Sequence, residues 1–91
     1  MKNRIIEIAV TDLATRLDQA RIAANDIEET APQSGVYGDI SDALRKTLAV
    51  LLDGDHVRAD AVYEAILDGN TVTQALAVEA KVHADQVAAD D

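Results

Sequence analysis

The sequence predicts an all-α fold, a small bundle of about four helices with one long N-terminal helix. Apolar residues recur every three or four positions along most of the chain. Capping residues and glycines separate the periodic segments, and no segment has the sustained period-two alternation of β-branched residues that a strand would need. With 91 residues and 48 % hydrophobic content, the chain is expected to fold as one domain over residues 1–91.

Residues 3–29 are predicted to form the long helix. Asn3 can cap its start, and Asp12 and Arg16 have the spacing of a favourable ion pair. Alternating steps of four and three generate a heptad seam, which packs on other helices or on a second copy of the chain. Homodimerisation through residues 6–27 is therefore expected. The seam consists of Ile6, Val10, Leu13, Leu17, Ala20, Ala24 and Ile27.

Residues 30–38 are predicted to form a loop, because they hold the only proline and two of the four glycines. A second helix is expected at about residues 40–53, capped by Asp39 or Ser41. Gly54 suits the left-handed conformation that follows many helices.

Asp55 can cap a third helix, at about residues 56–68, and Thr71 with Gln74 forms a capping box for a fourth, at about residues 71–89. The helical period assigns five apolar residues of the third helix to the core: Val57, Ala61, Val62, Ala65 and Ile66.

The charge of the chain is strongly negative and uneven. The net charge is −9; residues 1–46 carry eight acids and six bases, whereas residues 47–91 carry nine acids and two bases. Such a surface repels nucleic acid and anionic membranes and attracts basic protein surfaces. The same composition is typical of proteins adapted to high salt, and that interpretation stays open. The predicted partner-binding face comprises Asp53, Asp55, Asp60, Glu64, Asp68, Glu79 and Asp85.

Neither metal nor cofactor binding is expected. Asp53, Asp55 and Glu64 have the spacing of calcium-loop ligands, but Val57 and Arg58 replace the oxygen ligand and the glycine that such a loop needs. The two histidines lie among many carboxylates without a recognisable ligand set, and the chain has no cysteine. No nucleophile or phosphate-binding motif is present, so enzymatic activity is not expected.

The N-terminal residues lack the apolar run of a signal peptide, and no segment is apolar over the roughly 20 residues of a membrane span. A cytoplasmic protein is expected.

Residues 69–87 resemble a helix-turn-helix motif. Apolar and small residues occupy the matching positions, but Lys81 stands where the turn usually has glycine, and the would-be recognition helix has acids and no base. The alternative is one continuous helix from Val72 to about Ala89, which the strong capping at Thr71 favours. A transcriptional or regulatory role would follow from the motif.

In size and charge the chain is similar to small acidic proteins of phages and mobile elements, among them anti-CRISPR and DNA-mimic inhibitors. That resemblance implies a protein partner with a basic nucleic-acid-binding surface. The favoured hypothesis is an acidic interaction module of this kind; an oligomeric helical structural module is a further alternative.

Overall fold

The computed structural model describes residues 4–90, and the side chains of residues 4–88. These residues form four α-helices and no strand: α1 (Arg4–Thr30), α2 (Val36–Leu51), α3 (His56–Leu67) and α4 (Val72–Asp90). The predicted all-α fold with a long first helix is confirmed. The expected cap Asn3 lies outside the described residues. None of the described helices combines the length and the hydropathy needed to cross a bilayer.

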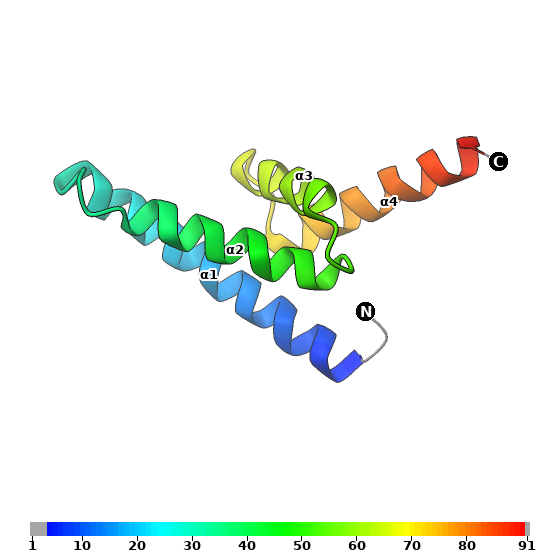
Figure 1. Ribbon diagram of the computed structural model, residues 1–91, viewed down its shortest axis with the longest axis horizontal. Helices are drawn as coiled ribbons and strands as arrows, with labels where there is room; N and C mark the ends of the chain where they lie inside the picture. Colours follow the sequence, from blue (N-terminus) through cyan, green and yellow to red (C-terminus); the bar gives the residue numbers. More distant parts are fainter. Residues whose placement is uncertain (1–3, 91) are drawn as a thin grey trace.

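The helices form an elongated rather than a spherical bundle (Figure 1). α1 and α2 pair as a hairpin, α3 packs on α2, and the second half of α4 projects away from the rest. The radius of gyration is 14.2 Å, against about 12 Å for a compact domain of this length. Much helix surface is therefore left without a neighbour in the same chain.

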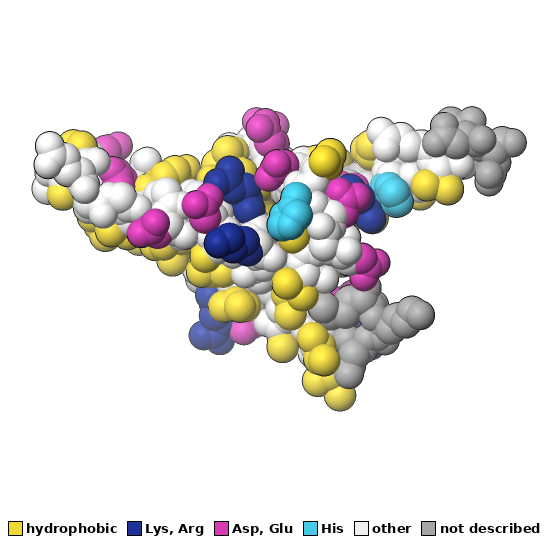
Figure 2. All heavy atoms as spheres, in the orientation of Figure 1, with side chains coloured by type: hydrophobic (Ala, Val, Ile, Leu, Met, Phe, Trp, Pro, Cys, Tyr) yellow, Lys and Arg dark blue, Asp and Glu magenta, His cyan; other side chains and the backbone are white. Residues whose placement is uncertain are grey.

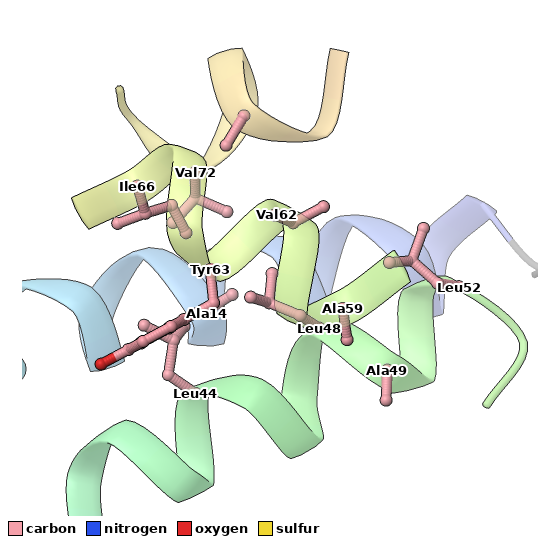
Figure 3. Packing of buried hydrophobic residues seen from close by; sticks show 11 residues of the cluster. Ala14, Leu44, Leu48, Ala49, Leu52, Ala59, Val62, Tyr63, Ile66 and Val72 are labelled. Carbon is pink, nitrogen blue, oxygen red and sulfur yellow. The ribbon is translucent and has the colours of Figure 1, made fainter. Parts of the chain in front are cut away.

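The core is small because many of its side chains are small. Twelve hydrophobic residues are buried, and five of them are alanines. Figure 3 shows α2 and α3 supplying most of the cluster, with Ala14 of α1 and Val72 of α4 closing it. The largest fully buried side chains are Leu44, Leu48, Val62 and Val72.

The predicted seam of α1 divides between two sides of the helix. The members that face the other helices are buried or half-buried: Val10, Leu17 and Ala24. The other members lie on a flank that stays partly exposed. The three large ones are each close to half exposed and Ala20 is half-buried: Ile6, Leu13, Ala20 and Ile27. Ala14, outside the predicted seam, is fully buried.

α2 begins at Val36, several residues before the predicted start. Gly35 precedes it with φ 71°, and neither Asp39 nor Ser41 caps the helix, so that prediction is wrong. Glu28 of α1 takes the capping role instead, since its Oε1 accepts a hydrogen bond from the backbone N–H of Tyr37 at 3.4 Å. Ser34 Oγ also accepts a hydrogen bond from the backbone N–H of Val36, at 3.5 Å. The start of α2 is therefore capped by the preceding loop and by a residue of another helix, and local sequence does not reveal the second partner.

The remaining ends follow the predicted local chemistry. The Asp55 side chain accepts from the Arg58 backbone N–H at 3.1 Å, and Gly54 has φ 82°. Thr71 and Gln74 exchange hydrogen bonds of 2.9 and 3.1 Å, as a capping box requires.

α4 is a single helix through Lys81. The continuous-helix alternative is confirmed, and the turn that a helix-turn-helix would need within residues 69–87 is not formed. Strong capping at Thr71 and the lack of a second cap after Lys81 account for the continuity.

Candidate protein-binding groove

A groove of about 320 Å³ runs between α3 and the middle of α4. Its surface is mainly apolar, with small alanine side chains between larger valines. Three charged or amide side chains complete it. The lining residues are Val57, Arg58, Ala61, Ala65, Ala75, Val78, Glu79, Val82 and Gln86.

The groove exists because α3 carries two apolar faces. The core takes one of them, formed by Ala59, Val62, Tyr63 and Ile66. The prediction that Val57 and Ala61 are buried is wrong: both are exposed, Val57 to 81 %. The bulkier Tyr63 and Ile66 lie on the core side, in the buried cluster that also contains Ala14 of α1 (Figure 3). On the second apolar face, Val57 and Ala61 are exposed and Ala65 is half-buried.

A bidentate ion pair joins the two walls of the groove. Arg58 Nε and Nη2 donate to the two carboxylate oxygens of Glu79, at 2.7 and 2.8 Å. The side chains are 24 % and 9 % exposed, so this pair is more shielded than an ordinary surface pair. The hydrogen bond to Glu79 raises the pKa of Arg58 above its ordinary value. Among the ion pairs of residues 4–88, it is the one that connects two helices.

Exposed carboxylates border the groove on both helices. Glu64 of α3 and Asp68, at the C-cap of α3, follow the groove residues Ala61 and Ala65 by three positions, which places them along its edge. On α4, Asp85 follows Val82 by three positions and is also exposed.

The other predicted face residues differ in position. Asp60 is exposed on α3, one turn before Glu64. Asp55 is exposed but caps α3, and Asp53 lies in the preceding turn with φ 56°. Glu79 is the exception, because it is buried and paired with Arg58 and so is not part of the exposed acidic surface. We use "acidic rim" for Asp60, Glu64, Asp68 and Asp85.

Within the described part of the chain, no three histidine or carboxylate side chains lie close enough to hold an ion. His56 is exposed at the start of α3, and His83 is half-buried on α4.

A second polar cluster, which sequence reasoning missed, joins the first three helices. Arg21 of α1 pairs with Asp18 at 3.0 Å and donates to the Tyr37 hydroxyl of α2 at 3.4 Å. Arg45 of α2 lies over the Tyr63 ring of α3, 5.2 Å from its centre. The only two aromatic residues of the chain contact arginines here. Because aromatic residues are so few, their positions in the sequence could have indicated this cluster. The cluster links α1 to α2 and α2 to α3.

Comparison of the chain with family models, curated proteins and solved structures finds no match.

We expect Glu79→Gln to lower the free energy of unfolding by about 2 kcal/mol, because it leaves the shielded Arg58 guanidinium without its counter-charge. Glu64→Gln, on the exposed edge of the same groove, is the matched control and should change stability by less than about 0.5 kcal/mol. Urea unfolding followed by circular dichroism measures both. Equal effects of the two substitutions would show that the ion pair does not stabilise the fold.

The two tyrosines should ionise in separate steps. The hydrogen bond from Arg21 lowers the pKa of Tyr37 below its ordinary value, whereas burial raises the pKa of Tyr63. Because the chain has no tryptophan, ultraviolet absorbance of the phenolate follows both directly. The step at lower pH should disappear in Tyr37→Phe. A single step that counts both residues would contradict the assigned cluster.

Proposed function

We propose that this protein is a small acidic interaction module that acts in the cytoplasm and binds a basic surface of a partner protein. The observation that carries the proposal is the apolar groove between α3 and α4 with carboxylates on both edges. The partner element that best fits it is an amphipathic helix with aliphatic residues on one face and lysine or arginine on the flanks.

The apolar part of the groove supports a helical ligand. Val57 and Ala61 of α3 and Val78 and Val82 of α4 all line the groove. Aliphatic side chains of a partner helix, spaced three and four residues apart, would cover these residues and exclude water from them. The small alanines leave room for larger incoming side chains.

The acidic rim supports a basic ligand. Residues 47–91 carry nine acids and two bases, and one of those bases, Arg58, is already neutralised by Glu79. The remaining charge attracts a basic partner from a distance and selects against acidic ones. Duplex DNA would be repelled, which argues against a DNA-binding regulator.

A basic helix or channel is a common feature of proteins that bind nucleic acid. Within this proposal, the module occupies such a surface and competes with nucleic acid for it, as an inhibitor of the anti-CRISPR or DNA-mimic type would. The uneven charge and the open groove support this role over that of a purely structural helical module.

The test uses a synthetic peptide of about 20 residues with leucines at helical spacing and lysines between them. The protein should bind it, bind a shuffled peptide of the same composition more weakly, and not bind duplex DNA. Affinity should fall as salt rises from about 0.1 to 0.5 M, since the rim acts over roughly a Debye length. Fluorescence anisotropy of the labelled peptide provides the measurement.

Removing the charges of the acidic rim tests whether the peptide binds this face specifically or responds only to the overall negative charge of the protein. The rim variant carries Asp60→Asn, Glu64→Gln, Asp68→Asn and Asp85→Asn. The matched control removes four exposed charges from α1 and α2, with Glu7→Gln, Asp26→Asn, Glu29→Gln and Asp39→Asn. We expect about tenfold weaker peptide binding for the rim variant, and a smaller loss for the control. Equal losses, or binding of DNA by the unmodified protein, would contradict the proposal.

A further inference from the structure

A second uncovered apolar surface lies on α1, on the opposite half of the chain from the groove. Twelve large hydrophobic residues of the described chain are exposed, and six of them belong to this helix. Hydrophobic side chains are visible over the first turns of α1 in Figure 2. The six residues are Ile5, Ile6, Ile8, Leu13, Ile22 and Ile27.

Part of this surface has the spacing of a helix-packing seam. One row of residues along α1 repeats at intervals of seven: Ile6, Leu13, Ala20 and Ile27. The exposed Ala9 and Ala23 lie between members of this row. We call this row the α1 flank. It lies beside the face that packs on α2, and so α1 carries two apolar faces, as α3 does.

One polar residue interrupts the α1 flank. Arg16 lies at its centre, is 73 % exposed and pairs with Asp12 of the same helix at 2.9 Å. A single polar residue within an apolar seam is a known means of selecting one register and one oligomeric state. The interruption is therefore compatible with a helix–helix interface.

We infer that the α1 flank binds the same flank of a second copy of this chain, which makes the protein a homodimer. The charge distribution favours this occupant. Residues 1–46 carry eight acids and six bases, so two copies meet through the less acidic half of each chain and keep the strongly acidic halves apart. Association through α3 and α4 would bring the like charges together instead.

The energetics of the isolated chain favour the same occupant. The core holds four fully buried side chains of the size of valine or larger, and small cores are commonly supplemented by oligomerisation. α1 has 27 residues, and at about 1.5 Å per residue it extends roughly 40 Å, which is long enough for an extended two-helix interface. A dimer would bury aliphatic side chains that the monomer leaves in water.

The experiment is sedimentation equilibrium of the unmodified protein and of two double variants. Leu13→Glu with Ile27→Glu charges the α1 flank, while Ile8→Glu with Ile22→Glu charges the other side of the same helix. Each variant replaces two aliphatic residues that are 46–60 % exposed and adds the same charge to the same helix. We expect the unmodified protein to have the mass of two chains at high micromolar concentration. The flank variant should dissociate at least about tenfold more readily than the control variant.

Circular dichroism of each variant separates dissociation from unfolding. All three proteins should keep the same helix content, since none of the four positions is buried. A mass of one chain for the unmodified protein would overturn the inference. So would equal weakening by both variants, which would place the interface elsewhere, or loss of helix content in the flank variant alone, which would make the α1 flank part of the folded monomer.

Discussion

The position of α4 depends on the ion pair between Arg58 and Glu79. Glu79 is the last buried residue of α4 within the described side chains, and beyond it the helix runs on with its side chains mostly exposed. Before it, Val72 and Ala75 anchor the first turn in the core. The bidentate contact, at 2.7 and 2.8 Å, sets how far the second half of α4 stands from α3. Because the two walls are linked at this point, the valines and alanines beside the pair line an open groove instead of closing on one another.

The small core explains why two apolar surfaces remain on one short chain. Five of the twelve buried hydrophobic residues are alanines, which cover little apolar surface. In addition to the face that packs in the core, α1 and α3 each have a second apolar face with exposed residues. These surfaces lie in halves of the chain that differ in charge: residues 47–91, around the groove, carry nine acids and two bases, whereas residues 1–46, which include α1, carry eight acids and six bases. A partner of opposite charge and a second copy of the chain would therefore compete little for the same surface. In this arrangement a dimer would present two acidic grooves.

Sequence reasoning predicted what local chemistry determines. The four helices, the Asp55 cap, the Gly54 turn and the capping box of α4 follow from neighbouring residues. The sequence-based predictions were wrong where contacts between residues far apart in the sequence determine the structure. Glu28 caps α2 from another helix and shifts its start, and the helical period cannot tell a core face from an uncovered one, as Val57 shows. The excess of acidic residues in the second half of the sequence indicated the α3–α4 region as the candidate site, but it could not show that Glu79 is buried and paired with Arg58. The groove could not be predicted from the sequence, because it depends on how α3 and α4 pack against each other.

The central claim is that the Arg58–Glu79 pair holds α3 and α4 in the geometry that opens the groove. The absence of cysteine allows specific spin labelling at Asp60→Cys on α3 and Lys81→Cys on α4, two exposed positions. Double electron–electron resonance, on samples diluted with excess unlabelled protein so that only distances within one chain are measured, should give one narrow distance distribution when Glu79 is present. With Glu79→Gln the distribution should broaden or shift, because α4 loses its last buried contact to α3. An unchanged narrow distribution in the variant would contradict the account and assign the geometry of the groove to the hydrophobic core alone.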